Sequence, residues 1–135
     1  MKPIIITTND YAELMLMISR GNFPPREQRE VQALMDELAR AQVVAPENVP
    51  ADVITMNTRA ELLDLDTGER MEFSLVVPSE ADIGAGRISV LAPIGTGMLG
   101  YRVGSEFEWP VPTGVRRLKV TGIHGQPEAS LAKAG

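Results

Sequence analysis

The sequence contains no cysteine and a single histidine, His124. Without cysteine the chain forms neither disulfides nor thiolate metal sites, and nothing in it indicates an oxidising compartment. A cluster of histidine ligands is excluded as well, and a histidine general base would have to be His124. No nucleophile is marked beside this residue, so we interpret it as a partly exposed side chain in the turn after the last strand. We therefore expect no metal, no cofactor and a location in the cytoplasm.

Long apolar runs and net positive charge are also missing. No segment approaches the roughly 18 apolar residues that indicate a membrane span. Residues Met1–Ile6 lack the apolar core and the cleavage site of a signal peptide, so a strand or extended arm is expected there. Acidic residues outnumber basic ones by 18 to 13, and the net charge of -5 disfavours nonspecific binding to nucleic acid. The one close basic cluster, at residues 116–119, has acidic partners nearby.

The first 44 residues predict an arm and two amphipathic helices. Asp10 is positioned to cap the first helix, with a glutamate three residues later in a capping-box arrangement, and Gly21 ends it. Pro25 begins a second helix that runs to about Gln42. Apolar positions at helical spacing mark the expected buried stripes, at Tyr11, Leu14, Met15, Ile18, Val31, Leu34, Met35, Leu38 and Ala41. Two such helices joined by a short turn are predicted to form an antiparallel helical hairpin over residues 1–44.

Residues 45–127 are predicted to form a mainly antiparallel sheet domain, which the Pro-containing segment 45–50 separates from the hairpin. The spacing of Ile94, Met98 and Leu99 predicts one short helix. Alternating apolar residues predict strands at 53–56, 59–65, 71–77, 88–90, 107–111 and 115–120. A loop is expected at 79–86 and a flexible tail at 128–135. The expected fold class is therefore α+β, a short helical hairpin followed by an antiparallel sheet with one short helix.

Three motifs have both a chemical and a structural interpretation. Gly95-Thr96-Gly97 with Gly100 lacks the Lys-Ser/Thr ending of a phosphate-binding loop, so tight packing of the short helix is preferred. Asp64 and Asp66 end a strand, and ordinary turn chemistry accounts for them better than a bound cation. Trp109 is expected to pack in the sheet, with an interface anchor as the alternative. No catalytic or metal-ligating residue is predicted.

Several short motifs together resemble the C-terminal domain of the Gre transcript-cleavage factors, which bind bacterial RNA polymerase. They are Val53-Ile54-Thr55-Met56-Asn57-Thr58-Arg59, Ile88-Ser89-Val90, Pro93-Ile94-Gly95, Leu99-Gly100, Val103-Gly104 and Gly114-Val115. With the shortened hairpin, residues 4–127 are most similar to the regulators of nucleoside diphosphate kinase, a Gre-related family. The resemblance implies an FKBP-like fold for the C-terminal domain and docking near the secondary channel of the polymerase.

The chain departs from the cleavage factors at the tip of its helical hairpin. In those factors, paired acids at the tip of a long hairpin help to hold a catalytic metal. The tip here contains Arg20, Asn22, Phe23 and Arg26 and has no acid. A first helix of about ten residues also spans only about 15 Å, too short to reach deep into a channel. Stimulation of cleavage is therefore not expected.

A second departure lies in the loop through which the cleavage factors dock, where Asp-Ser-Pro is replaced by Leu91-Ala92-Pro93. A contact through this loop is expected to be more apolar, and we assign it to Leu91, Ala92, Pro93, Ile94 and Met98. Leu91 and Met98 are equally compatible with a place in the core.

The leading hypothesis from this resemblance is a monomeric, non-enzymatic transcription regulator. It would bind RNA polymerase near the secondary channel, compete with Gre-type factors without stimulating cleavage, and influence nucleoside diphosphate kinase levels. It would meet nucleic acid only through the polymerase, and no membrane. Two alternatives stay open: a peptidyl-prolyl isomerase, suggested only by the FKBP-like fold, and a protein whose hairpin binds the kinase directly.

Overall fold

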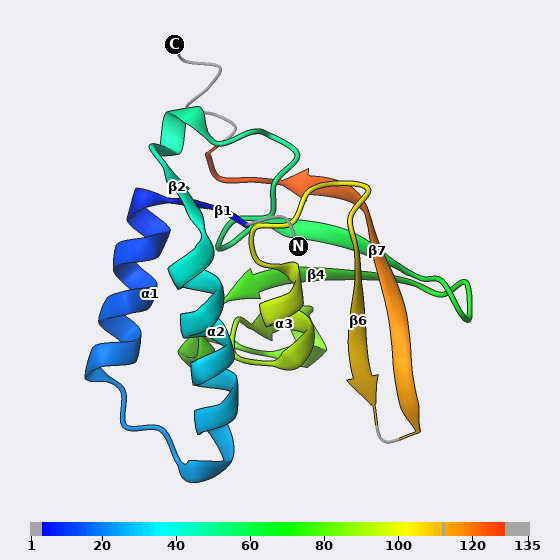
Figure 1. The fold of residues 1–135 in the computed structure, drawn as a ribbon. Helices are drawn as coiled ribbons and strands as arrows, with labels where there is room; N and C mark the ends of the chain where they lie inside the picture. The colour runs from blue at the N-terminus through cyan, green and yellow to red at the C-terminus, as the bar shows by residue number, and fades with distance from the viewer. Residues whose placement is uncertain (1–3, 112, 129–135) are drawn as a thin grey trace.

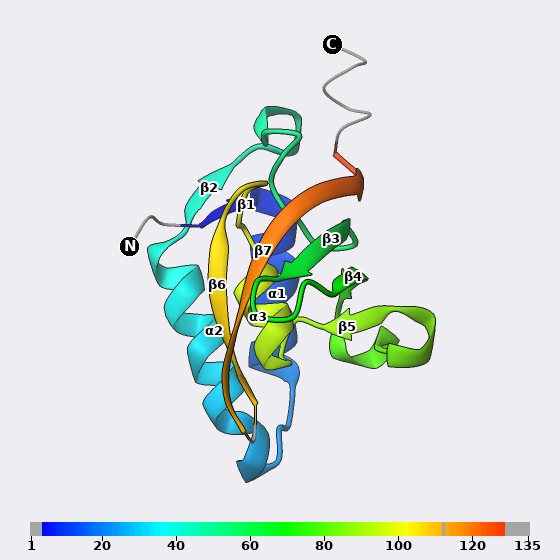
Figure 2. The same cartoon turned by 90° about the vertical axis from the view of Figure 1, so that its right-hand side faces the viewer.

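The computed structural model describes residues 4–111 and 113–128. A helical hairpin lies beside a five-stranded sheet, with one short helix between them (Figure 1). The perpendicular view looks onto the sheet, with the helices behind it (Figure 2). The predicted tail at 128–135 lies outside the described residues except for Glu128. No helix of the described ranges is long and apolar enough to cross a bilayer.

The helical hairpin is joined at its base by a small parallel sheet. Its elements in chain order are β1 (Ile5–Thr7), α1 (Thr8–Arg20), a 3-10 turn (Pro25–Glu27), α2 (Gln28–Arg40) and β2 (Gln42–Val44). β1 leads directly into α1, α2 leads directly into β2, and the two strands pair in parallel. The helices must therefore run out and back, as Figure 1 shows. A strand and two helices occur in this region as predicted, but the bounds of the helices differ. α2 ends at Arg40, before the predicted end at about Gln42, and Gln42 begins β2, which is an additional element.

Helix α1 begins earlier than a cap at Asp10 would allow. Thr7 is the N-cap, because its backbone is extended and its side-chain oxygen accepts the Asp10 N–H at 3.0 Å. The prediction that Asp10 caps the helix is therefore wrong. Asp10 lies in the first turn, and its carboxylate accepts the backbone N–H of Met56 at 3.0 Å. The end of the helix is as predicted, since Gly21 is the C-cap and donates its N–H to the Met17 carbonyl.

The main sheet has the strand order β5-β4-β3-β7-β6. Its strands are β3 (Arg59–Asp64), β4 (Arg70–Val76), β5 (Arg87–Ser89), β6 (Glu106–Val111) and β7 (Gly114–Gly125). β5 runs parallel to β4, and the other pairings are antiparallel. α3 (Pro93–Met98) follows β5, and short 3-10 turns lie at 46–48, 78–80 and 83–85. The predicted strands from residue 59 onward and the short helix are confirmed.

The predicted strand at 53–56 does not form. In the part of the chain that the structure describes, Val53 makes an isolated bridge to Arg102, and Asn57 has a left-handed φ of 66°. All four residues of the segment are buried. The backbone of Ile54 accepts from Gly100 and donates to Tyr101, so the segment is enclosed by the chain that follows α3. The apolar run reflects burial on all sides, which the sequence pattern does not distinguish from a strand.

One hydrophobic core joins the hairpin to the sheet. Leu14, Leu34 and Leu38 of the helices belong to the same buried cluster as the inward-facing residues of β3, β4 and β7. Met15 and Met35, which were expected in the buried stripes, are each 38% exposed. Each lies about 100° around its helix from a buried leucine, beyond the face that meets the sheet. The side chain of Trp109, for which packing in the sheet is predicted, lies outside the described part of the structure.

Candidate functional site

The bend between β5 and α3 is fixed by its own hydrogen bonds. The Ser89 hydroxyl accepts the Leu91 N–H at 3.0 Å, and the Ser89 carbonyl accepts the Ala92 N–H at 3.0 Å. The Thr96 hydroxyl donates to the Val90 carbonyl at 2.6 Å and closes the bend from the helix side. Pro93 occupies the first turn of α3, where its missing N–H is tolerated. The bend is therefore a preformed surface feature.

Only part of this bend faces solvent. Leu91, Ile94 and Met98 are 6%, 2% and 0% exposed. Of the two places that the sequence left open for Leu91 and Met98, the structure shows the core. Pro93 is exposed and Ala92 is half-exposed. Three of the five residues assigned to docking therefore support the bend from inside, and an incoming partner would meet Ala92 and Pro93. Binding through these two residues stays a prediction.

The glycines around α3 are explained by close packing. A Cβ at Gly95 would overlap the Ser89 carbonyl, and one at Gly97 would lie 2.6 Å from the Phe107 ring. Gly100 has a φ of 78° and lies against Ile4. The backbone of α3 thus approaches its neighbours as closely as atoms allow. This agrees with the preference for packing over phosphate binding.

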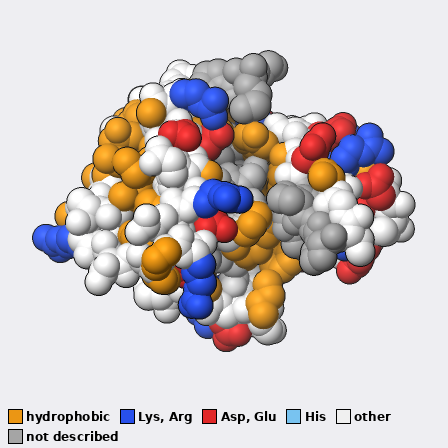
Figure 3. All heavy atoms as spheres, turned by 60° about the horizontal axis from the view of Figure 1, so that its bottom comes forward, with side chains coloured by type: hydrophobic (Ala, Val, Ile, Leu, Met, Phe, Trp, Pro, Cys, Tyr) orange, Lys and Arg blue, Asp and Glu red, His pale blue; other side chains and the backbone are white. Residues whose placement is uncertain are grey.

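The tip of the helical hairpin is basic. Arg20, Asn22 and Arg26 are exposed, whereas the Phe23 ring is half-buried and occupies the space beside Gly21. Arg29, in the first turn of α2, is exposed as well and was missed in the prediction of the tip. Residues 20–26 contain no acid. Figure 3 brings this end of the molecule forward and shows basic, acidic and hydrophobic side chains interspersed over that face.

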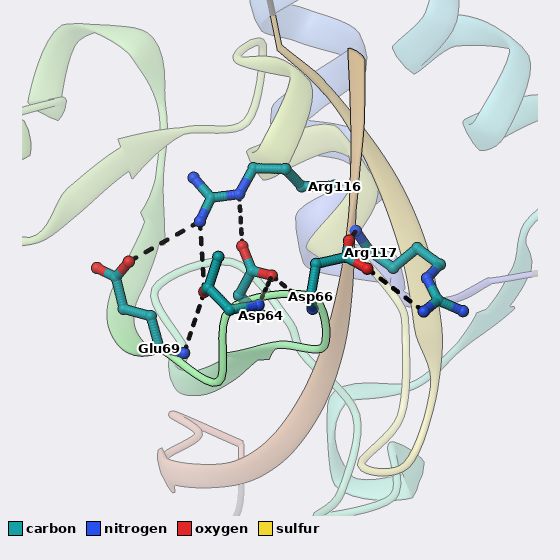
Figure 4. Close-up of polar contacts among 6 residues, drawn as sticks. Asp64, Asp66, Glu69, Arg116 and Arg117 are labelled. Atoms are coloured by element: carbon teal, nitrogen blue, oxygen red, sulfur yellow. Dashed lines mark hydrogen bonds and ion pairs between the residues drawn. The ribbon is translucent and has the colours of Figure 1, made fainter. Parts of the chain in front are cut away.

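Charged groups connect the β3–β4 turn to β7 (Figure 4). Asp64 is fully buried, accepts the N–H groups of Asp66 and Thr67 at 2.8 and 3.1 Å, and lies 2.5 Å from Arg116 Nε. Burial by itself would raise the pKa of Asp64, but these hydrogen bonds and the Arg116 guanidinium outweigh it and lower the pKa. Asp66 accepts the Arg117 N–H at 3.2 Å. Turn chemistry is confirmed, and no cluster of three potential metal ligands occurs in residues 4–111 and 113–128.

A second buried carboxylate, Asp10, connects α1 to the segment before β3. It is 7% exposed and bonded to the Met56 N–H. Burial raises the pKa of Asp10 to about 6 against the opposing effect of the Met56 hydrogen bond, with a further rise from Glu128. Glu128 itself accepts the Thr55 hydroxyl at 2.6 Å. These contacts join the hairpin, the 55–58 segment and the C-terminal end of the described chain.

An open hollow of about 450 Å³ lies at the end of β7. It is lined by Asn57, Arg59, His124, Gly125, Gln126 and Pro127. His124 is 44% exposed, which agrees with the predicted partial exposure. It lies within β7 (Gly114–Gly125), however, so its predicted place in the turn after the last strand is wrong. Its Nε2 lies 3.2 Å from Glu61 Oε2, and Arg59 pairs with Glu72. Its lining residues include no Phe, Tyr or Trp, the side chains that an apolar isomerase pocket requires.

Comparisons with known proteins agree with this division into hairpin and sheet. Residues 49–125 match the family described as "Transcription elongation factor, GreA/GreB, C-term", and residues 2–44 match the one described as "Rnk N-terminus". The regulator of nucleoside diphosphate kinase of Escherichia coli (strain K12) is 42% identical over 99 residues, 73% of each chain. The chain belongs to the Rnk branch of the GreA/GreB family.

Other members of the GreA/GreB family are similar in sequence and in fold. Transcription elongation factor GreA of Syntrophotalea carbinolica is 34% identical over 93 residues, which are 69% of this chain and 59% of that factor. The structure of the transcription elongation factor GreA/GreB from Nitrosomonas europaea matches with a TM-score of 0.73 and 35% identity, covering 91% of this chain and 98% of that one. The α+β fold of the Rnk-type chain is thus GreA/GreB-like, and its relatives are named as a regulator and as elongation factors.

Proposed function

We propose that this Rnk-type protein is a transcription regulator that docks on RNA polymerase, near its secondary channel, through the bend at Ala92 and Pro93. It acts as a cytoplasmic monomer and competes there with longer Gre-type factors. It does not stimulate transcript cleavage. It influences the level of nucleoside diphosphate kinase, as the name of its Escherichia coli relative suggests.

The rigid bend is the single observation that most supports docking. Its exposed apolar corner, Pro93 with Ala92, is held by the hydrogen bonds of Ser89 and by three side chains that are buried beneath it. A preformed surface loses little conformational entropy when a partner binds. An apolar contact without a charge to desolvate fits the replacement of the acid and the hydroxyl that cleavage factors carry in this loop.

The hairpin supports binding without cleavage. α1 has 13 residues, so it is about 20 Å long at about 1.5 Å per residue, somewhat longer than the sequence prediction. Its tip presents Arg20 and Arg26 where a metal-holding factor needs carboxylates. A guanidinium repels a divalent cation, so this tip cannot hold one.

A binding experiment with purified RNA polymerase tests the proposal. The wild type is expected to be retained by immobilised polymerase, and Pro93→Asp is expected to lose retention because it places a charge in an apolar contact. Val103→Asp is the matched control, since Val103 is 41% exposed in a turn outside the bend. Failure of the wild type to bind would contradict the proposal. Equal loss of binding in both variants would show that the bend is not the specific contact.

No observation favours the isomerase alternative. The aromatic pair Tyr101–Phe107 makes an edge contact at 5.8 Å and packs against the core. A proline-peptide isomerisation assay is expected to show no turnover above background. Among the described residues, no contact identifies the kinase as a direct partner of the hairpin.

A further inference from the structure

The ten arginines of the chain fall into two groups by their partners. Seven form ion pairs with Asp or Glu, namely Arg40, Arg59, Arg70, Arg87, Arg102, Arg116 and Arg117. The other three, Arg20, Arg26 and Arg29, are exposed and form no ion pair with any described residue. All three lie at the tip of the helical hairpin. The acids nearest in sequence, Glu27 and Glu30, are half-buried.

Two of these arginines occupy electrostatically unfavourable positions. Arg26 lies in the 3-10 turn that precedes α2, and Arg29 lies in the first turn of α2. The N-terminal end of a helix carries a partial positive charge, so cations there destabilise the helix. The fold therefore gains nothing from these two charges. Residues whose charge disfavours the local structure, with no contact that compensates for it, are typical of functional surfaces.

We propose that Arg20, Arg26 and Arg29 dock against a carboxylate-rich protein surface. The inference rests on the proposed function, in which that surface belongs to RNA polymerase. A guanidinium presents its donors in a planar fork that matches a carboxylate. Arginine and aromatic residues are also enriched at protein interfaces, and the tip combines its arginines with Phe23 and two prolines.

Nucleic acid fits this tip less well than an acidic protein does. The whole chain carries a net charge of -5, which opposes approach to a polyanionic backbone. Binding to single strands commonly uses an aromatic ring on which a base stacks. The Phe23 ring is packed beside Gly21 and half-buried, so it is poorly placed to stack.

Docking of the tip would give the protein a second point of attachment in addition to the Pro93 bend. The bend is apolar, so its contribution is insensitive to salt, whereas the contribution of exposed arginines is screened by salt. The salt dependence of the affinity therefore reports on the tip.

The test compares two triple variants that have the same net charge. The tip variant carries Arg20→Gln, Arg26→Gln and Arg29→Gln, and the control carries Arg59→Gln, Arg70→Gln and Arg102→Gln at arginines that are already paired. Affinity for nucleic-acid-free RNA polymerase is measured over a range of salt concentrations. We expect the tip variant to bind about tenfold more weakly and with a shallower salt dependence. The control should bind like the wild type. The Tm of the tip variant should change little, because the removal of two cations from the N-terminal end of α2 offsets the loss of Arg20, a favourable cation in the last turn of α1.

The remaining outcomes contradict the inference in different ways. Unchanged binding of the tip variant, with loss in Pro93→Asp, would overturn the role of the tip and leave the proposed function standing. No binding by the wild type would remove both. An equal loss in both triple variants would indicate bulk charge alone, and a Tm below that of the wild type would indicate a structural role. Arginine-dependent binding to free RNA, or only to polymerase that carries RNA, would identify nucleic acid as the partner instead.

Discussion

The buried carboxylate of Asp10 makes the stability of the joint between hairpin and sheet depend on pH. Asp10 is 7% exposed, and its pKa is raised from 3.8 to about 6, mainly by burial. The folded state thus holds a proton on Asp10 more tightly than the unfolded state does. The stabilisation is fully present below pH 3.8 and is lost as the pH rises through about 6. This shift corresponds to a total of about 3 kcal/mol.

Replacement of Asp10 by Asn removes this dependence while keeping an oxygen that can accept the Met56 N–H. Between pH 5 and pH 7.5 the wild type should lose about 1 kcal/mol of stability through Asp10 that the variant does not lose. The attraction between the ionised carboxylate and the N-terminal end of α1 is already part of the folded-state pKa, so it adds no separate term.

The measurement is urea-induced unfolding of both proteins at several pH values, with the difference in unfolding free energy plotted against pH. From pH 5 to pH 7.5, the unfolding free energy of the variant should rise by about 1 kcal/mol relative to that of the wild type. An NMR titration of the Asp10 carboxyl carbon supplies the midpoint directly, with a value near 6 expected. A free-energy difference that is flat with pH, or a midpoint at or below 3.8, would refute the reasoning.

Three further perturbations test the packing and the capping. Gly95→Ala should destabilise the protein by about 1–3 kcal/mol in denaturant unfolding, because the added Cβ meets the Ser89 backbone. Gly122→Ala is the control, since no heavy atom lies within 4 Å of its added Cβ. Equal effects of the two substitutions would contradict the close packing at Gly95. Arg116→Ala should cost about 1–3 kcal/mol at neutral pH by leaving buried Asp64 without its cation. The cost should shrink as the pH falls through the lowered pKa of Asp64, and a pH-independent cost would argue against the ion pair. Thr7→Ala should lower the unfolding free energy by about 1 kcal/mol in thermal or urea unfolding, because the N-cap is lost. An unchanged unfolding free energy would show that Thr7 is not the residue that caps α1.

Local signals in the sequence were sufficient for most of the regular elements. The apolar periodicity of α1 and α2 and the alternation in β3 and β4 each belong to one short segment. The elements that sequence reasoning missed depend on distant partners. β2 is only three residues long and exists because β1 pairs with it. The 53–56 segment is apolar because the chain after α3 encloses it, which no local pattern reveals.

The candidate site was only partly predictable for the same reason. Thr7 and Asp10 are both good capping residues, and the choice between them depends on the Met56 N–H, which is 46 positions away in the chain. From the sequence, Leu91 and Met98 could face either the core or a partner. The packing of α3 against β5 and β6 places both in the core. Arg20 and Arg26 were predictable as tip residues, but the sequence does not show which arginines form ion pairs. The structure adds Arg29 to them, because these three are the arginines without an ion pair among the described residues.

The central claim is that an apolar bend docks on RNA polymerase while an acid-free hairpin supplies no chemistry. The most direct measurement is transcript cleavage by stalled polymerase, stimulated by a Gre cleavage factor, in the presence of increasing amounts of this protein. The account predicts no cleavage with the protein alone, progressive loss of the stimulated cleavage with the wild type, and no such loss with Pro93→Asp. Cleavage stimulated by the protein itself, or equal competition by the wild type and Pro93→Asp, would contradict it.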